Sequence, residues 1–263
     1  MVKLPTGALP MTITLLPDFA AAFALVMGRI GTLVMLMPGV GDRVIPARMR
    51  LSFALLLSLL FLPLVRQTLP PISAGIEPFI KILILEILIG LMIGTAIRVT
   101  LSAMQLAGTV IAQQMGLSFS ASVDPTAGVQ NPTIATFLVL IATAMIFALD
   151  LHHLSIKGMH DSYAMLMPGE VPTVGDGTQL VIKTFIGAFK VGIQISAPFL
   201  VFAIVFNLGL GVLSRLMPQL QIFFLAMPAT IIIGTLILIA AIGVMMNVFL
   251  THFVSVLSQF VAK

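Results

Sequence analysis

The chain has 263 residues, of which 59% are hydrophobic and only 8% charged, and its formal net charge is +4. Soluble domains carry about 25% charged residues, so this chain lacks the polar side chains needed to cover a globular surface. The 13 basic residues form no Lys/Arg block, which argues against nucleic-acid binding, and the absence of cysteine excludes disulfides and thiolate chemistry. The composition predicts an integral membrane protein with a single membrane domain over residues 1–263.

Six apolar stretches follow one another along the chain. A helix needs about 20 residues to cross the hydrocarbon core, so the second stretch is short and the last two are over-long. Pro198 and Pro228 lie inside these last two, where a proline removes a helical hydrogen bond and bends the helix. The pattern predicts an all-α membrane protein of about six long, kinked apolar helices in hairpins, with a straight six-span bundle as the alternative. The stretches cover residues 19–37, 51–65, 79–103, 133–156, 180–213 and 220–250.

Two opposite charges lie deep in these apolar stretches. Arg29 falls in the first and Glu86 in the third, and burying either alone costs about 2.5 to 3.5 kcal/mol on insertion scales. We predict a buried Arg29–Glu86 ion pair; the alternative is that each side chain reaches the bilayer surface or meets a neighbouring subunit. Gly90 and Gly94 form a GxxxG spacing, which is expected to allow close helix packing.

The segment between the third and fourth stretches, residues 105–132, is too polar to face lipid and carries a single charge, Asp124. It also lacks the Lys and Glu residues of a solvated linker. Irregular backbone survives at membrane depth only where protein or a water-filled passage surrounds it, because hydrocarbon offers no hydrogen-bond partner. The segment is therefore predicted to lie inside an assembly.

An enzymatic interpretation depends on one cluster of metal-capable and acid/base residues. The chain has no HExxH, GxSxG, P-loop or dinucleotide fingerprint, so no catalytic residue, metal site or cofactor is predicted, and helix capping is the favoured role of the cluster. A secondary transporter is a further alternative, because transporters also use bent helices and buried charges at the midplane. The cluster consists of Asp150, His152, His153, His160 and Asp161.

Four segments together resemble the FliR/SctT family of type III secretion export gates. They are RIGTLVMLMPGVGDRVIPARMRLSFALLLSLLFLPL (29–64), EILIGLMIGTAIRVTLSAMQLAGTVIAQQMGLSFSASVDPTAGVQNP (86–132), DLHHLSIKGMHDSYAMLMPG (150–169) and FNLGLGVLSRLMPQLQIFFLAMPATIIIG (206–234). The likeness covers nearly the whole chain, in the family's order and spacing. The QQMGLSF and VDP residues favour a flagellar protein, FliR, and a virulence-type (SctT) gate subunit remains the alternative.

The resemblance implies a subunit of the flagellar protein export gate in the bacterial inner membrane, at the flagellar basal body. With FliP and FliQ it would form the channel through which unfolded export substrates leave the cytoplasm, with FlhB around the entrance and FlhA below. Residues 1–178, including loop 105–132, would be the FliP-like part, and residues 179–263 the FliQ-like helical hairpin. Membrane lipid and the other gate subunits would cover the apolar helices.

The resemblance also places the family's plug loop, which lies across the closed channel, on residues 105–122. The chemistry of these residues fits that role, since neutral amides and hydroxyls bond to one another and Gly116 allows the backbone to turn. The alternative is a packed connector without a gating role. The centre of the plug would be Gln113, Gln114, Met115, Gly116, Leu117, Ser118 and Phe119.

Overall fold

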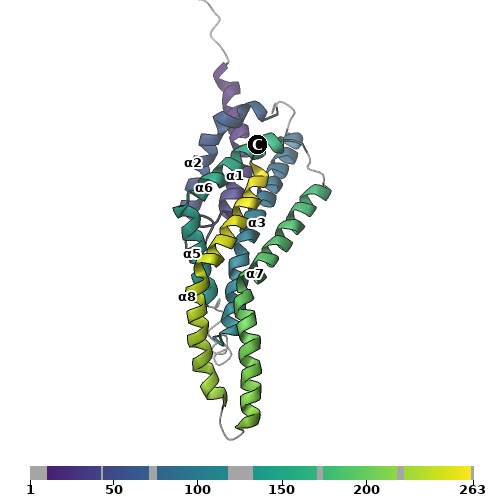
Figure 1. The fold of residues 1–263 in the computed structure, drawn as a ribbon. Helices are drawn as coiled ribbons and strands as arrows, with labels where there is room; N and C mark the ends of the chain where they lie inside the picture. Colours follow the sequence, from purple (N-terminus) through teal and green to yellow (C-terminus); the bar gives the residue numbers. More distant parts are fainter. Residues whose placement is uncertain are drawn as a thin grey trace, which may run out of the picture. The chain divides into compact units, whose positions relative to one another are not determined.

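The computed structural model describes residues 11–42, 44–70, 76–117, 133–170, 174–217 and 222–261. In these residues the secondary structure is helical and contains no strand (Figure 1), which confirms the predicted all-α fold. The helices are α1 (Met11–Leu36), α2 (Ala47–Val65), α3 (Ile76–Gln114), α5 (Thr133–Ala148), α6 (Leu151–Met165), α7 (Val174–Leu216) and α8 (Ile222–Leu257), with 3-10 turns at Arg66–Thr68 and Ser258–Phe260.

Five of the described helices are long and apolar enough to cross a membrane, or six if the bent pair α5 and α6 forms one span. This confirms the prediction of about six long apolar helices. The 43 residues of α7 extend over about 64 Å at 1.5 Å per residue. That is roughly twice the ~30 Å thickness of a hydrocarbon core, so α7 is longer than one membrane crossing requires.

Helix α3 continues past Ala103, where the sequence predicted its end, to Gln114. The irregular segment predicted to begin at Gln105 therefore starts with helix. Ala107 and Ile111 lie one turn apart and are completely buried, so one face of these residues continues the apolar stripe that the prediction ended too early. Residues 118–132, the remainder of that segment, lie outside the described residues.

The fourth apolar stretch, predicted to be continuous over residues 133–156, is two helices. The break comes at Leu149 and Asp150, and Asp150 has the left-handed value φ 56°, which Asp tolerates better than most residues. The Asp150 amide donates to the Phe147 carbonyl at 3.2 Å, and the His153 amide donates to the Asp150 carbonyl at 3.0 Å. These bonds end α5 and begin α6.

The prolines lie within helices. Pro63 is inside α2, two residues before its end, and Pro198 and Pro228 are inside α7 and α8. Both long helices continue past their prolines, and α7 and α8 run side by side as an antiparallel hairpin (Figure 1).

The helices gather into two compact units, each built from separate parts of the sequence. The first unit contains α1, α2, the first half of α3 and most of α6. The second contains the rest of α3, α5, nearly all of α7, and α8. Residues that are at most 3% exposed form the core of each unit: Leu25, Ile30, Leu33, Phe61 and Ile93 in the first, and Met104, Ile111, Leu138, Phe199 and Phe249 in the second.

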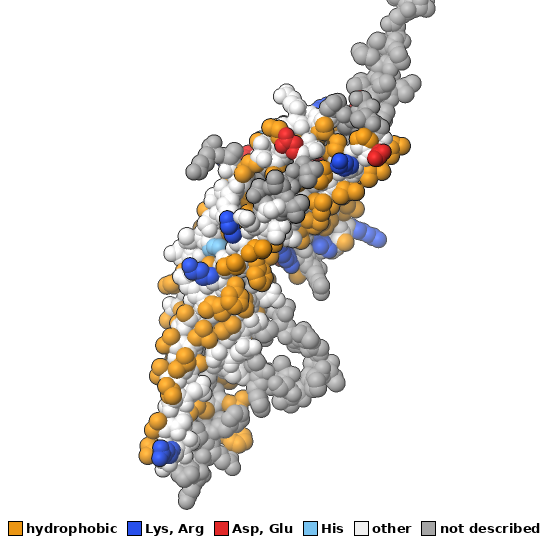
Figure 2. All heavy atoms as spheres, turned by 90° about the vertical axis from the view of Figure 1, so that its right-hand side faces the viewer, with side chains coloured by type: hydrophobic (Ala, Val, Ile, Leu, Met, Phe, Trp, Pro, Cys, Tyr) orange, Lys and Arg blue, Asp and Glu red, His pale blue; other side chains and the backbone are white. Residues whose placement is uncertain are grey.

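Large apolar side chains also cover much of the outer surface. Figure 2 shows hydrophobic side chains spread over one face, with few charged groups between them. Soluble monomers rarely expose apolar patches larger than a few hundred Å², so this surface is suited to contact with lipid or other proteins. Among the exposed residues are Leu55, Leu56, Leu59 and Leu60 of α2, and Val201, Ile204, Val205 and Leu208 of α7.

Candidate functional site

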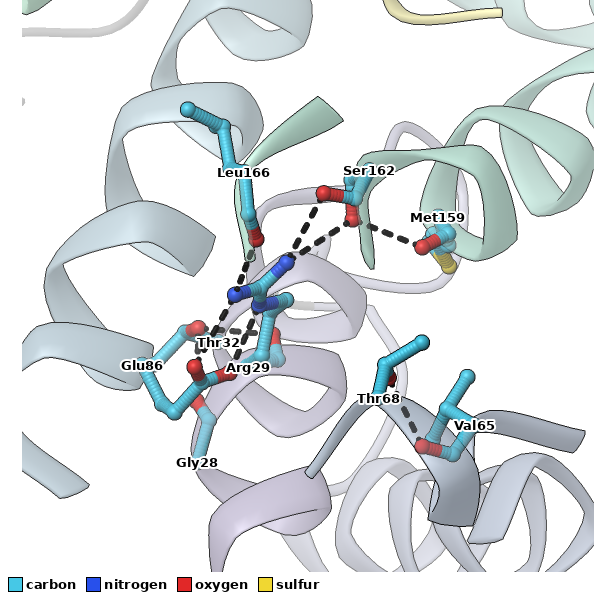
Figure 3. Close-up of polar contacts among 9 residues, drawn as sticks. All are labelled: Gly28, Arg29, Thr32, Val65, Thr68, Glu86, Met159, Ser162 and Leu166. Carbon is cyan, nitrogen blue, oxygen red and sulfur yellow. Dashed lines mark hydrogen bonds and ion pairs between the residues drawn. The ribbon is translucent and has the colours of Figure 1, made fainter. Parts of the chain in front are cut away.

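The structure brings together Arg29 of α1 and Glu86 of α3, within the first unit. Arg29 Nε donates to Glu86 Oε2 at 2.7 Å and Nη2 donates to Oε1 at 2.9 Å, so the two groups form a fork of two parallel bonds (Figure 3). Neither side chain has any solvent exposure. A buried charge is tolerated only when it is paired and hydrogen-bonded, and each of these groups provides that partner for the other.

The remaining Arg29 donors reach the C-terminal end of α6. Nη1 donates to the Ser162 carbonyl at 3.0 Å, with the Ser162 hydroxyl at 3.5 Å, and Nη2 donates to the Leu166 carbonyl at 3.0 Å (Figure 3). The last carbonyls of a helix lack partners within the helix, and a cation is favourable at this end of the helix dipole. Arg29 therefore joins α1, α3 and the end of α6 through one guanidinium group.

An aromatic ring completes this cluster. The Arg29 Cζ atom lies 4.2 Å from the centre of the Tyr163 ring, within the range of a cation–π contact. Tyr163 is 2% exposed, and its hydroxyl has no hydrogen-bond partner among the described residues. The ring, and not the hydroxyl, is thus the part of Tyr163 that contacts the charge.

The predicted GxxxG residues pack against α1. A Cβ atom added at Gly90 would collide with the Thr32 hydroxyl and lie 2.6 Å from the Arg29 carbonyl. One added at Gly94 would lie 2.7 Å from Leu36 Cδ1. The two glycines therefore allow α1 and α3 to approach closely enough for Arg29 to meet Glu86.

The described part of the predicted plug centre lies in the second unit, where α3 ends. Gln113 is exposed, Gln114 is half-buried, and Met115 is 1% exposed. Gly116 has φ 73° and Leu117 follows it in the turn. Ser118 and Phe119 lie outside the described residues.

The end of α3 is a Schellman motif, a helix cap that needs a left-handed residue. The Leu117 amide donates to the Ala112 carbonyl at 3.0 Å, and the Gly116 amide donates to the Gln113 carbonyl at 3.1 Å. Glycine takes the left-handed position without a steric cost. Gly116 therefore fixes where the helix stops and where the chain leaves it.

Glycines and alanines hold the last turns of α3 against three other helices. A Cβ at Gly108 would lie 2.8 Å from the Ala135 amide nitrogen of α5, and one at Gly192 of α7 would lie 3.0 Å from the Ala103 carbonyl. One at Gly234 of α8 would lie 2.6 Å from Met115 Cγ. These close approaches, two of them to backbone atoms, leave the helix little freedom to shift.

A cavity of about 240 Å³ adjoins the turn after α3. Its polar lining includes neutral amide and hydroxyl side chains, and the lining holds no charged group. Asn207 Nδ2 and the Thr230 hydroxyl each donate to a carbonyl of their own helix, at 2.7 and 2.8 Å. The lining residues are Gln113, Gln114, Met115, Gly116, Ala203, Phe206, Asn207, Leu210, Ala226, Met227, Thr230 and Ile231.

The histidine-rich segment divides into two groups. Asp150, His152 and His153 each offer a ligand atom, and these atoms lie within 4.8 Å of one another. The side chains of Asp150 and His153 are 76% and 70% exposed, and His153 Nδ1 lies 3.7 Å from Asp150 Oδ1. In the other unit, His160 Nδ1 lies 3.0 Å from Asp161 Oδ1. The first group sits at the start of α6, where Asp150 also accepts the helix-starting bond described above.

Sequence reasoning did not find the partners that complete either site. The carbonyls of Ser162 and Leu166 leave no signature in a sequence, although Tyr163, the one tyrosine of the chain, was a usable signal. Gly192 and Gly234 are two glycines among 21, and nothing in the sequence distinguishes them as contacts of α3.

The fold and these sites define a helical integral membrane protein whose buried polar groups join helices. Residues 20–256 match the family model described as "Bacterial export proteins, family 1". The chain therefore belongs to this family of bacterial export proteins.

Several proteins that are similar to this chain are named as flagellar proteins. A protein of Caulobacter vibrioides named "Flagellar biosynthetic protein FliR" is 42% identical over 221 residues, which are 82% of this chain and 88% of that protein. Proteins of the same name from Bacillus subtilis and Escherichia coli are 30% and 28% identical over 230 and 229 residues, in each case 86% of this chain and 88% and 86% of theirs. The relatives are named as export or biosynthetic proteins and not as enzymes.

Proposed function

We propose that this chain is a subunit of the flagellar type III protein export gate in the bacterial inner membrane, at the flagellar basal body. It assembles there with FliP and FliQ into the channel for unfolded export substrates. The observation that carries this proposal is the 42% identity, over most of both chains, to a protein named for flagellar biosynthesis. The flagellar name of the relatives favours the flagellar gate over its virulence-type counterpart.

The surface of the chain supports assembly with other subunits. Helix α7 is about twice as long as a membrane crossing and exposes large apolar side chains along it, among them Val201 and Leu208. Lipid can cover only the part of this surface that lies in the bilayer. Partner helices would cover the rest, which fits a gate built from FliP and FliQ with FlhB and FlhA at its cytoplasmic side. Residues 1–178 would serve as the FliP-like part and residues 179–263 as the FliQ-like hairpin.

In this proposal the loop that follows α3 is the plug. The described turn has the properties that such a loop needs at its base: a helix cap at Gly116, a buried anchor side chain at Met115, and neutral amides at Gln113 and Gln114. Because these groups carry no fixed charge, a passing polypeptide of any sequence meets only weak interactions. The chain provides passive gating, and the energy for export comes from other components.

Two measurements test the proposal in the native host. A tagged copy of the chain, solubilised in mild detergent, should co-purify with FliP and FliQ. Removal of residues 116–119 should make the membrane permeable to small solutes while the same complex is still recovered. Recovery of the chain as a stable monomer, or an unchanged permeability together with normal export in the deletion strain, would contradict the proposal.

A further inference from the structure

We infer that Met115, seated against Gly234 of α8, is the anchor that holds the base of the plug. This inference rests on the proposed function, since it explains how the proposed plug is kept in its closed position. It concerns residues on α3 and α8 that lie in the same compact unit.

The contact runs along the whole Met115 side chain. A Cβ atom added at Gly234 would lie 2.6 Å from Met115 Cγ, 3.2 Å from Cε and 3.4 Å from Sδ. Gly234 is buried and Met115 is 1% exposed. Because Cγ lies close to the backbone, a Cβ at Gly234 displaces the whole Met115 side chain and not only its flexible end.

Met115 is also the last buried residue of the described stretch 76–117. Before it, Gly108 and the Ala103 carbonyl are in close contact with α5 and α7, as described above. After it, a Cβ added at Gly116 would meet no atom of the described residues within 4 Å. Within residues 76–117, the tight packing therefore ends between Met115 and Gly116, at the left-handed turn.

The neighbouring cavity provides a second place for the Met115 side chain. Met115 lines this space of about 240 Å³ together with residues of α7 and α8. An unbranched thioether side chain repacks more readily than a branched one. The Met115 side chain can thus leave its contact with Gly234 and enter the cavity, and the turn at Gly116 moves with it. In this inference, the position of Met115 against Gly234 belongs to the closed plug.

The test adds a methyl group at Gly234, the residue against which Met115 packs. Gly234→Ala is placed in the complete gate in the native host, and uptake of a small hydrophilic dye is measured together with the amount of complex recovered through a tag. We expect a roughly tenfold rise in uptake, the change produced by about 1.4 kcal/mol of overpacking. Gly243→Ala is the matched control, since the same change on the same helix meets no atom within 4 Å in the part of the chain that the structure describes. Uptake in this control should stay at the wild-type level.

A double-variant comparison shows whether the effect passes through Met115. Met115→Ala alone should also raise uptake, and Gly234→Ala should add nothing further in that background. Unchanged uptake in Gly234→Ala with normal recovery of complex, or additive effects of the two changes, would overturn the inference. If Gly234→Ala lowers the amount of complex, Met115→Ala decides: raised uptake supports the anchor and an intact barrier overturns it.

The deletion of residues 116–119 separates this inference from the proposed function. If the deletion makes the membrane permeable but Gly234→Ala and Met115→Ala do not, the proposed plug is supported and the inferred Met115 anchor is contradicted. If the deletion has no effect either, the plug itself is wrong.

Discussion

Arg29 and Glu86 are 57 residues apart in the sequence, and their side chains form a fully buried ion pair with bonds of 2.7 and 2.9 Å. The same guanidinium group also donates to the end of α6, so all of its donor nitrogens have acceptors (Figure 3). The two charged groups are thus bonded to each other, and the guanidinium group is also bonded to backbone carbonyls. Its role is to fix the relative positions of three helices within one unit.

Removing one charge of this pair should destabilise the protein more than removing both. Glu86→Gln or Arg29→Met leaves a buried charge without its partner, which costs about 3 to 5 kcal/mol, whereas an apolar pair of similar volume avoids that cost. We expect the double variant Arg29→Met/Glu86→Met to be recovered in the gate complex at a higher level than either single variant. The thermal stability of the purified complex gives the same comparison; losses that simply add would contradict a direct pair.

The Tyr163 ring and hydroxyl should differ in importance. Tyr163→Phe keeps the ring against Arg29 and removes a hydroxyl that has no partner among the described residues, so its effect on stability should stay within about 0.5 kcal/mol. Tyr163→Ala opens a cavity in the core and should cost about 3 to 5 kcal/mol. Melting temperatures of the complex in detergent provide the measurement. A large loss in Tyr163→Phe would contradict the conclusion that the ring, and not the hydroxyl, is the part of Tyr163 that matters.

Gly90 should tolerate no side chain. Gly90→Ala places its methyl group 2.6 Å from the Arg29 carbonyl, which is backbone and cannot move aside without separating α1 from α3. Overpacking of this kind costs about 1 to 3 kcal/mol, and the level of protein in the membrane should fall accordingly. Gly175→Ala is the control in the same unit, because a Cβ there meets no described atom within 4 Å. Equal losses in the two variants would count against the close packing.

At Gly116 the backbone angle, and not the available space, should limit substitution. The position has φ 73°, and a Cβ atom added there would meet none of the described atoms within 4 Å. Asn tolerates the left-handed region, whereas a β-branched residue there is strained by about 1 to 2 kcal/mol or more. We therefore expect Gly116→Asn to keep the membrane barrier and Gly116→Val to impair it in the dye-uptake assay. Equal uptake in the two variants would mean that the Schellman cap does not matter for closure.

The sequence predicted those features that depend on hydrophobicity and on buried charge. Two opposite charges inside apolar stretches need partners, so the Arg29–Glu86 pair could be predicted without coordinates. The end of α3 could not, because polar residues such as Gln105 and Gln113 lie on the exposed side of a helix whose buried side continues to Ile111. The break at Asp150 was also missed, since a left-handed Asp has no sequence signal as strong as glycine.

The contacts at Gly234 and at the Ser162 carbonyl were beyond sequence reasoning for a different reason. Gly234 touches Met115, and the Ser162 carbonyl accepts from Arg29, only because the helices pair in a particular register. A single sequence contains the residues but not that register. The structure was needed to show which of these glycines are contact points and which, like Gly243, leave room for a Cβ atom among the described residues.

Cross-linking of a protein chain in transit tests the gate most directly. The chain contains no cysteine, so Gln113→Cys provides a unique thiol beside the turn at the end of α3. In the native complex, an export substrate halted in transit and carrying one cysteine should cross-link to Gln113→Cys, and not to Leu56→Cys on the exposed face of α2. Cross-links at Leu56→Cys with none at Gln113→Cys would show that export substrates do not pass the end of α3.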